Sequence, residues 1–329
     1  MLKTQHARLS VAPMMDWTDR HCRAFHRVLS RQVLLYTEMV TAAALIRGGA
    51  RHLLDFDTRE HPVALQLGGS DPAELAEATR MGVDRGYAEV NLNVGCPSDR
   101  VQSGSFGAIL METPVLVADC LRAMADAAGS VPVTMKSRIG VDEQEAEQVL
   151  PDLLARMGDA GVRRVQIHAR KAWLQGLSPK ENRDIPPLDY SLVHAMKARF
   201  PELHISINGG IATLDEAVEQ LKHVDGVMIG RAAYHDPGNV LLSADSRVFG
   251  QPCPQADRVA AAMAMVPHIK AHLADGGKLN QVTRHMLGLF GGLPGARGWR
   301  RTLSEGAAKP GAGADVLHAA LDHVVTAAA

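Results

Sequence analysis

Aromatic residues and cysteines are scarce in this chain of 329 residues. Phe, Trp and Tyr together make up 4% of it, so the core has to rest on Val, Ile, Leu, Met and Ala, as in the interiors of α/β proteins. The four cysteines stand far apart, with no C-x-x-C pair and no second cysteine or histidine cluster at zinc spacing. The sequence therefore predicts neither a disulfide scaffold nor a metal site.

Long apolar runs and an excess of one charge are also missing. No stretch approaches the roughly 18 apolar residues that a membrane helix needs, and the first twenty residues lack the apolar segment of a secretion signal. We therefore expect a cytoplasmic protein that binds no membrane. With 35 Lys and Arg against 36 Asp and Glu, the net charge is -1, so any nucleic-acid surface must be a local basic patch.

Eight short runs of β-branched or apolar residues recur through the first two thirds of the chain. They cover residues 9–12, 33–37, 63–67, 88–92, 131–135, 164–167, 204–207 and 226–229. Helical segments lie between them, for example 73–85 and 115–127, each preceded by a capping residue and a proline. This alternation predicts an α/β fold, a TIM (β/α)8 barrel. A doubly wound open sheet is the main alternative, but no G-x-G-x-x-G follows the first strand.

The predicted strands end close to residues that are suited to binding or proton transfer. These residues are Pro13, Met14, Met15, Glu38, Gln66, Asn91, Asn93, Lys136, Arg138, His168, Asn208, Gly209, Gly210, Gly230 and Arg231. The carboxyl ends of barrel strands share one face, so these side chains would converge. Each has a structural explanation by itself, such as a hydrogen-bonded core histidine for His168. Their coincidence at eight strand ends predicts an active site.

Glycines follow the last two predicted strands. In Asn208-Gly209-Gly210 and Gly230-Arg231 the missing Cβ atoms would let backbone N–H groups approach a phosphate, and Arg231 would add a positive charge. The pattern predicts a phosphorylated cofactor or substrate.

Cys96 lies just beyond the fourth strand run, in a loop that continues through Gly104 and Gly107 and can close as a lid. A free thiol has a pKa of about 8.5, so it is mostly protonated at neutral pH and can donate a proton. From its position alone three roles stay open, namely a proton donor, a nucleophile with a paired base, and a packing thiol. The other three cysteines have no comparable setting, and we expect them to be structural.

Two segments carry basic side chains that suit nucleic acid. Residues 170–190 show no regular period and include Lys180 and Arg183 beside Trp173, which offers a stacking surface.

From about residue 244 the strand runs stop, and residues 255–273, 278–290 and 315–325 have helical patterns. We expect a barrel domain over 1–243 and a small helical domain over 244–329.

The expected helical domain contains nine Lys and Arg against six Asp and Glu. In a helix, Arg297 would share a face with Arg300 and Arg301. Ordinary solvated surface charge is the alternative to nucleic-acid binding here and in residues 170–190.

Seven motifs along the chain resemble those of the tRNA-dihydrouridine synthases. They are APMMDWTD at 12–19, LQLGG at 65–69, NLNVGCP at 91–97, MKSRIG at 135–140, IHAR at 167–170, NGGI at 208–211 and GRAAY at 230–234. GLSPKENR at 176–183 and GARGWRR at 295–301 are most similar to the bacterial A-type branch, which modifies positions 20 and 20a of the tRNA D-loop.

This resemblance implies an FMN-dependent enzyme that reduces the C5=C6 bond of uridine to dihydrouridine, with NADPH as the electron donor. It implies Cys96 as the general acid that protonates C5. FMN would be tightly bound by Pro13, Met14, Met15, Gln66, Lys136, His168, Asn208, Gly209, Gly210, Gly230 and Arg231.

The resemblance also implies tRNA as the partner. We expect the chain to act as a monomer. The uridine has to turn out of its stack to reach a flavin. The residues expected to contact tRNA are Asn93, Lys180, Arg183, Arg297 and Arg300.

Two other functions remain compatible with these residues. One is an FMN barrel dehydrogenase that acts on a free small molecule, of the dihydroorotate type, which would not need the basic helical segment. The other is a non-catalytic RNA-binding protein built on a barrel, which would not need a flavin.

Overall fold

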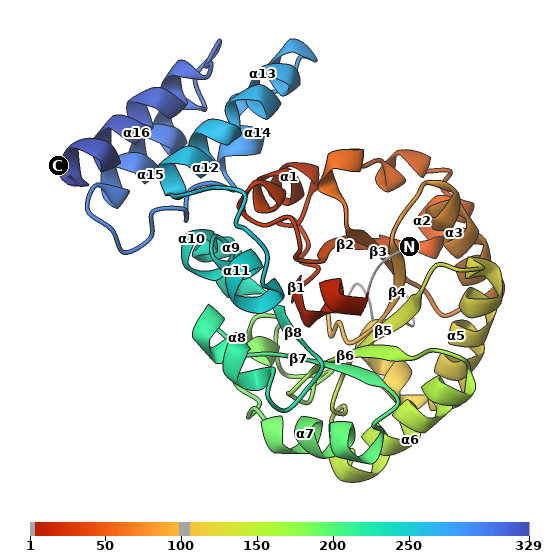
Figure 1. Cartoon of the computed structure of the whole chain (residues 1–329). Coiled ribbons are helices and arrows are strands. Elements are labelled where there is room, and N and C mark those ends of the chain that lie inside the picture. Colours follow the sequence, from red (N-terminus) through yellow and green to blue (C-terminus); the bar gives the residue numbers. More distant parts are fainter. Residues whose placement is uncertain (1–3, 99–105, 329) are drawn as a thin grey trace.

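The structure, a computed structural model, describes residues 4–98 and 106–328. Its centre is a sheet of eight parallel strands in the order β1-β8-β7-β6-β5-β4-β3-β2. The ends of this order meet, because the Val11 N–H donates to the Leu34 carbonyl at 3.0 Å and the Leu34 N–H donates to the Leu9 carbonyl at 3.1 Å. The sheet forms the TIM (β/α)8 barrel that the sequence predicts (Figure 1).

Helices follow every strand and cover the outside of the barrel (Figure 1). The strands are β1 (Leu9–Val11), β2 (Leu35–Thr41), β3 (Val63–Gly68), β4 (Glu89–Val94), β5 (Val133–Arg138), β6 (Arg164–His168), β7 (His204–Asn208) and β8 (Gly226–Ile229). The α-helices up to residue 249 are α1 (Arg20–Leu29), α2 (Ala42–Ile46), α3 (Pro72–Asp84), α5 (Pro114–Ala128), α6 (Ala146–Asp159), α7 (Tyr190–Arg199), α8 (Leu214–Gln220), α9 (Arg231–His235), α10 (Pro237–Val240) and α11 (Ala244–Phe249). The short 3-10 helices are η1 (Thr4–Arg8), η2 (Arg51–Leu54), η3 (Thr58–Glu60), η4 (Gly107–Glu112) and η5 (Glu181–Arg183).

Local signals start α3 and α5 where the sequence predicts. The Asp71 carboxylate accepts the Glu74 N–H at 2.9 Å, and Pro72 is the first residue of α3. Helix α5 also begins with a proline, but Thr113 makes no capping bond. Its hydroxyl donates instead to the Leu110 carbonyl at 3.4 Å.

Several strands extend beyond their predicted ends. Strand β2 runs from Leu35 to Thr41, so Glu38 lies inside it, and β4 and β5 include Asn93 and Arg138. The prediction followed apolar runs, whereas strand pairing continues through polar residues when these face the inside of a barrel.

The inside of the barrel differs from the layer between strands and helices. Val90, Leu92 and Val94 alternate with Glu89, Asn91 and Asn93 along β4 and belong to the main hydrophobic core. The three polar residues face inward, as the hydrogen bonds of Asn91 to side chains of β3, β5 and β6 show. A second, smaller apolar cluster comprises Ala12, Leu34, Tyr36, Ala64 and Met228. The aliphatic core that the composition predicts thus surrounds a partly polar barrel interior.

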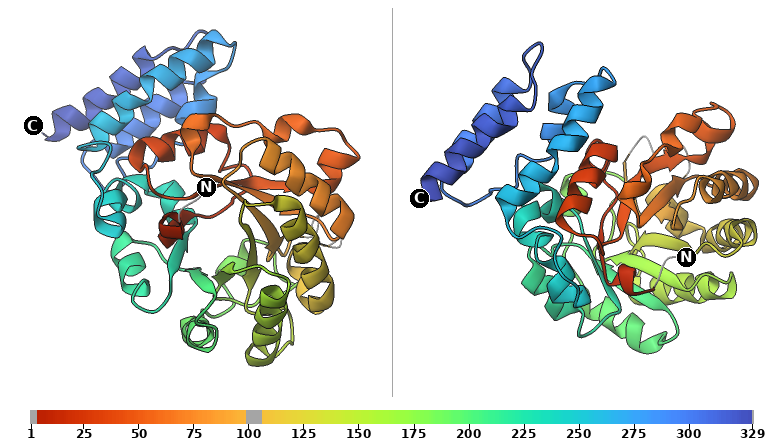
Figure 2. Two further views of the ribbon diagram at one scale, coloured as in Figure 1. Left: turned by 45° about the vertical axis from the view of Figure 1, so that its right-hand side comes forward. Right: turned by 45° about the horizontal axis from the view of Figure 1, so that its top comes forward.

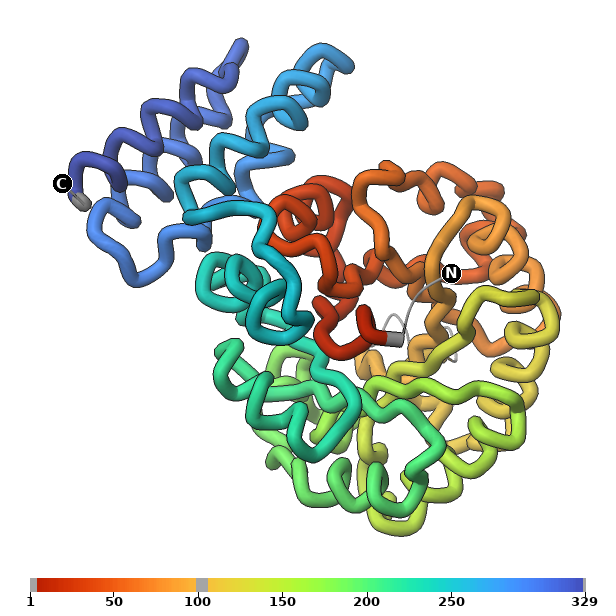
Figure 3. Tube along the Cα trace, in the orientation of Figure 1, coloured from red at the N-terminus to blue at the C-terminus, as the bar shows by residue number. Residues whose placement is uncertain are grey.

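Five more helices form a group on one side of the barrel, close to α1 and α9 to α11 (Figures 1, 2 and 3). They are α12 (Arg258–Ala264), α13 (Val266–Ala274), α14 (Leu279–Thr283), α15 (Ala296–Gly306) and α16 (Asp315–Ala328). The predicted helix 255–273 is split close to Pro267, since proline interrupts a helix interior. The predicted helix 278–290 ends at Thr283, and turns follow it. The Met286 carbonyl in these turns accepts the indole N–H of the buried Trp299 at 3.1 Å.

The start of α11 is attached to the barrel. The buried Asp245 accepts the hydroxyl of Ser30 and the N–H of Arg31, the latter at 2.8 Å. The division of the chain at residue 244 therefore stays a prediction. Across residues 4–98 and 106–328, no helix combines the length and the apolar character required to span a bilayer.

Candidate active site

Cys96 and His168 lie at the same rim of the barrel. Cys96 follows the end of β4 by two residues, and His168 is the last residue of β6. Strand β5 lies between them and pairs Arg138 with His168. The Arg138 Nε donates to the Gly95 carbonyl at 3.0 Å, which joins the Cys96 loop to this rim.

The backbone around Cys96 is held by hydrogen bonds. The N–H groups of Gly95 and Cys96 both donate to Asn93 Oδ1 at 3.0 Å, and the Cys96 carbonyl accepts the Ala108 N–H at 2.9 Å. The half-buried thiol lies 3.5 Å from the Ser98 hydroxyl. The structure thus holds the thiol at the rim. Gly104 of the expected lid lies outside the described residues.

Lys136 and His168 give the centre of the rim its electrostatic character. Burial, and then the charge of Arg138, lower the pKa of Lys136 to about 8. Burial, Arg138 and Lys136 together lower the pKa of His168 well below its ordinary value, so this ring is neutral at pH 7. Among the described residues, none forms a hydrogen bond or ion pair with the Lys136 ammonium. A ligand with carbonyl oxygens or ring nitrogens, such as a flavin, fits an unpartnered cation beside a neutral imidazole.

Arg138 joins two loops of the rim and was left without a role by the sequence. Besides Gly95, its buried guanidinium donates to the carbonyls of Lys171 at 2.9 Å and Asn182 at 3.0 Å. Asn182 in turn accepts the Trp173 N–H at 2.7 Å. The position of Arg138 at a buried strand end was the available signal, but its backbone partners are unreadable from sequence.

The glycines after β7 have no room for a side chain. Gly209 and Gly210 have φ angles of 108° and 72°. A Cβ on Gly209 would lie 2.5 Å from His168 Cδ2, and Tyr190 donates its hydroxyl to the Gly209 carbonyl at 2.6 Å. Backbone at positive φ with no Cβ is what a phosphate cradle requires. The side chain of Asn208 is already used, since its Nδ2 donates to the Met228 carbonyl at 2.7 Å.

The loop after β1 lies next to the glycine that follows β8. The Ala12 N–H donates to the Ile229 carbonyl at 2.8 Å, and a Cβ on Gly230 would lie 3.8 Å from Met14 Sδ. Pro13 and Met14 are half-buried, whereas Met15 is exposed. Three of the predicted flavin residues and Gly230 are therefore neighbours.

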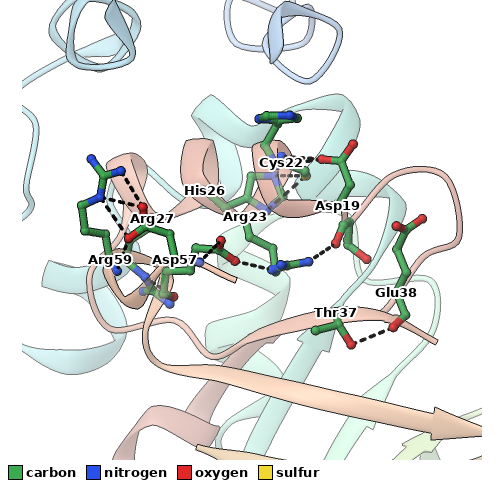
Figure 4. A network of polar contacts seen from close by, with 12 residues as sticks. Asp19, Cys22, Arg23, His26, Arg27, Thr37, Glu38, Asp57 and Arg59 are labelled. Carbon is green, nitrogen blue, oxygen red and sulfur yellow. Dashed lines mark hydrogen bonds and ion pairs between the residues drawn. The ribbon is translucent and has the colours of Figure 1, made fainter. Parts of the chain in front are cut away.

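Side chains of α1 and β2 support the loop after β1 (Figure 4). Asp19 caps α1 by accepting the N–H groups of His21 and Cys22 at 2.9 Å. The Arg23 Nη1 donates to the Thr18 carbonyl at 2.8 Å. The Glu38 carboxylate, whose pKa is raised by burial, accepts the Asp16 N–H at 2.5 Å.

Asp19 also connects the rim to the C-terminal helices. It accepts Arg284 Nη2 at 2.5 Å and lies 3.1 Å from His285 Nε2. Burial opposes its ionisation, but hydrogen bonding and the charge of His285, with further donors, lower the pKa of Asp19 below its usual range. Sequence reasoning missed this link because its partners are 265 or more positions apart.

The predicted tRNA residues belong to three parts of the chain, namely β4, the segment of η5 and α15. Lys180 and Arg183 are exposed in and next to η5, and Arg297 and Arg300 are exposed one turn apart on α15. Asn93 differs, because its side chain is buried in β4 and its amide is engaged. Their contacts with tRNA stay predictions.

Arg231 carries an ion pair that the sequence did not indicate. Its Nη2 lies 2.7 Å from Asp184 Oδ1, so the first residue of α9 contacts the segment that contains Arg183. Burial, and then Arg231, lower the pKa of Arg183. The arginines of this region therefore lie close together around one carboxylate.

A family model described as "Dihydrouridine synthase (Dus)" matches residues 10–325. The chain belongs to the dihydrouridine synthase family. It is 58% identical over 315 residues to the tRNA-dihydrouridine(20/20a) synthase of Salmonella typhi, covering 95% of this chain and 94% of that protein. The protein of the same name from Vibrio vulnificus is 54% identical over 319 residues, covering 97% of each. The resemblance stated from the motifs is confirmed.

Solved structures support the fold alone. The old yellow enzyme homologue from Zymomonas mobilis has a TM-score of 0.52 at 10% identity and covers 70% of this chain and 86% of its own. Morphinone reductase has a TM-score of 0.51 at 12% identity, with coverages of 77% and 88%. Both comparisons agree with the barrel.

Proposed function

We propose that the chain is a cytoplasmic enzyme that reduces the C5=C6 bond of uridines 20 and 20a in the D-loop of tRNA, with FMN as cofactor and NADPH as electron donor. Membership of the dihydrouridine synthase family makes the chain an oxidoreductase that acts on uridine in tRNA. The position preference follows the names of the relatives. The observation that carries the site is the presence of Cys96, Lys136 and His168 at one rim.

The residues around the rim fit FMN. The phosphate would lie against Gly209, Gly210, Gly230 and Arg231, which would supply backbone N–H groups and a positive charge. Asn208 would line the FMN site with its backbone, because its side-chain amide already donates to the Met228 carbonyl. Gln66, Lys136, His168, Pro13, Met14 and Met15 would hold the ring system.

The chemistry needs a hydride for C6 and a proton for C5 of the uracil. The hydride would come from bound FMN, with NADPH as the source of the electrons. Cys96 would donate the proton to C5, which removes the negative charge that develops there and on O4. A neutral thiol suits this role at pH 7, whereas an ordinary carboxylic acid would be ionised. Lys136, with a pKa of about 8, stays mostly protonated and would stabilise the developing charge.

The substrate has to be bound as RNA with one base turned out of its stack. Asn93 beside Cys96 would meet this base, while Lys180 and Arg183 would bind the backbone near the rim. Arg297 and Arg300 would bind it from the helical part, which we assign to tRNA binding over 244–329, with the flavin site in 1–243. We infer that the protein acts on tRNA as a monomer.

Replacement of Cys96 tests the proposed mechanism. We expect Cys96→Ala to keep bound flavin and tRNA affinity but to lower the rate of dihydrouridine formation by about 10²- to 10⁴-fold, because the proton donor is gone. The product is measured by mapping dihydrouridine in purified tRNA. Cys253→Ala serves as the matched control, since Cys253 bonds only to Ser246 among its described neighbours. Undiminished product from Cys96→Ala would exclude this thiol as the acid.

A further inference from the structure

Buried side chains form a continuous chain of hydrogen bonds inside the barrel, from the first residue of β4 to the Cys96 loop. Its members, in order, are Glu89, Thr134, Asn91, Gln66 and Asn93. All five are buried, and Glu89, Asn91 and Thr134 have no exposed area. The four bonds between them measure 2.6, 2.8, 2.8 and 2.9 Å.

A buried charge lies at the start of this chain. Glu89 forms an ion pair with Arg164, and the Tyr36 hydroxyl donates to Glu89 Oε1 at 2.5 Å. Arg164 and Tyr36 are buried as well. An ionised carboxylate has no hydrogen to donate, so every partner of Glu89 has to be a donor. The Thr134 hydroxyl, which is the partner of Glu89 in this series of hydrogen bonds, therefore donates its hydrogen to Glu89.

This requirement sets the direction of each later bond. With its hydrogen used, the Thr134 oxygen can only accept, and it accepts from Asn91 Nδ2. The other amide hydrogen of Asn91 goes to Gln166 Oε1 at 2.9 Å. Asn91 Oδ1 then faces Gln66 and accepts its Nε2, and Gln66 Oε1 accepts Asn93 Nδ2. If any side-chain amide of this series were rotated by 180°, two donors or two acceptors would face each other.

The chain of bonds ends on the backbone that carries the thiol. Because Asn93 Nδ2 is turned toward Gln66, Asn93 Oδ1 faces the loop and accepts the N–H groups of Gly95 and Cys96. With Asn93 reversed, its NH₂ group would oppose these two N–H donors and the loop would lose both bonds. The orientation of Asn93 therefore helps to hold the Cys96 backbone, together with the bonds from Arg138 and Ala108.

We propose that Thr134 and Asn91 are positioning residues for uridine reduction, because they transmit the polarity of the buried Glu89 to Gln66 and Asn93 and so fix the Cys96 loop. The claim about catalysis rests on the proposed role of Cys96 as the acid. The claim about loop position does not, because it concerns only hydrogen bonds of the protein. Neither residue touches substrate or cofactor; both act through Gln66 and Asn93.

The test removes the hydroxyl of Thr134 from the flavin-loaded enzyme. In Thr134→Val we expect kcat for tRNA reduction to fall by about tenfold or more at an unchanged KM, because small misplacements of a reacting group are costly. We also expect the alkylation rate of Cys96 by iodoacetamide to change by about threefold or more. Mass spectrometry of the Cys96 peptide gives this rate, with the half-buried Cys253 of the same molecule as internal reference. Thr134→Ser should restore both values.

Thr79 provides the matched control. It is fully buried on α3 and its hydroxyl has no hydrogen-bond partner among the described residues, so Thr79→Val makes the same substitution without breaking such a bond. We expect wild-type kcat and alkylation from it. If Thr134→Val does not fold, Thr134→Ala asks the same question with Thr79→Ala as control.

Three results would overturn the proposal. They are wild-type kcat and alkylation in a folded Thr134 variant, an equal effect of the Thr79 variant, and failure of Thr134→Ser to restore kcat. A product-forming Cys96→Ala enzyme would instead remove the acid role of Cys96, while the alkylation rates would still test the loop position.

Discussion

At the scale of single residues, Lys136 shows how a charged side chain suited to a ligand lowers the free energy of unfolding of the flavin-free protein. Its ammonium lies at the rim without a partner in the described chain, and burial followed by Arg138 lowers its pKa from 10.5 to about 8. Between these two values the unfolded chain binds more protons than the folded one, so the free energy of unfolding rises with pH. Below pH 8 the full destabilisation is present. A bound ligand with a negative or carbonyl group would offset it.

This reasoning makes a prediction for Lys136→Met. We expect the free energy of unfolding of the flavin-free variant, measured with urea at neutral pH, to exceed that of wild type by about 1 kcal/mol or more, because the half-buried charge is gone. The rise of stability between pH 8 and 10.5 should shrink, and flavin affinity should fall. Lys270→Met, an exposed change on α13, is the control. A less stable Lys136→Met protein at neutral pH would contradict the argument.

At the scale of elements, histidines join α1 to α13. His21 Nδ1 lies 3.0 Å from His268 Nε2, and the rings of His21 and His272 are 4.3 Å apart. Burial lowers the pKa of His21 to about 4 and also lowers that of His268. A hydrogen bond between two ring nitrogens needs one of them unprotonated. The packing of the helical group against the barrel therefore depends on neutral imidazoles.

Acid should weaken this contact. The folded pKa of His21 is below its ordinary 6.5, so the unfolded chain binds more protons between about pH 6.5 and pH 4, and stability is lost as the pH falls through this window. We expect the melting temperature to drop on going from pH 7 to pH 5, and His21→Gln to reduce that drop by about 3 °C. Thermal unfolding at both pH values measures it. His318→Gln, an exposed change on α16, should leave the drop intact, and an unchanged drop in His21→Gln would contradict the prediction.

At the scale of the whole molecule, the barrel and the helical group have to present their basic side chains to one tRNA. Asp19 at the rim bonds Arg284 and His285, and α1 packs against α12 and α14, so the two parts share several contacts. Arg297 and Arg300 lie exposed on α15, while Lys180 and Arg183 belong to the barrel. A tRNA bound by both parts would make affinity depend on residues that never touch the flavin site.

Removal of the two α15 arginines tests this arrangement. We expect the double variant Arg297→Ala/Arg300→Ala to weaken tRNA binding by about tenfold or more and to reduce the slope of log Kd against log salt by about 2, because two phosphate contacts are lost. Filter binding over a range of salt concentrations gives both values. Arg80→Ala/Arg122→Ala removes the same charge from α3 and α5 and should change little. Equal weakening by both double variants would show an effect of net charge alone.

The sequence by itself determined the order of elements and the residue types at the rim. Strand and helix alternation, the helix starts at Pro72 and Pro114, and the glycines at 209 and 210 are local features, set by neighbouring residues. The motifs were long enough to identify the family. These predictions succeed because hydrophobic period, capping and turn chemistry act over a few positions along the chain.

Only the tertiary structure decided which partners the buried polar groups have. Residues far apart in sequence meet in the hydrogen-bond series of Glu89, Thr134, Asn91, Gln66 and Asn93. The same holds for the three carbonyls bound by Arg138 and for the contact of Asp19 with His285. It also showed that the Asn93 side chain is buried and bonded to Gln66 and to the Cys96 loop. Strand residues alternate between two faces, and closure of the sheet turns one face into an interior where amides from neighbouring strands satisfy one another. No local pattern encodes which of them meet.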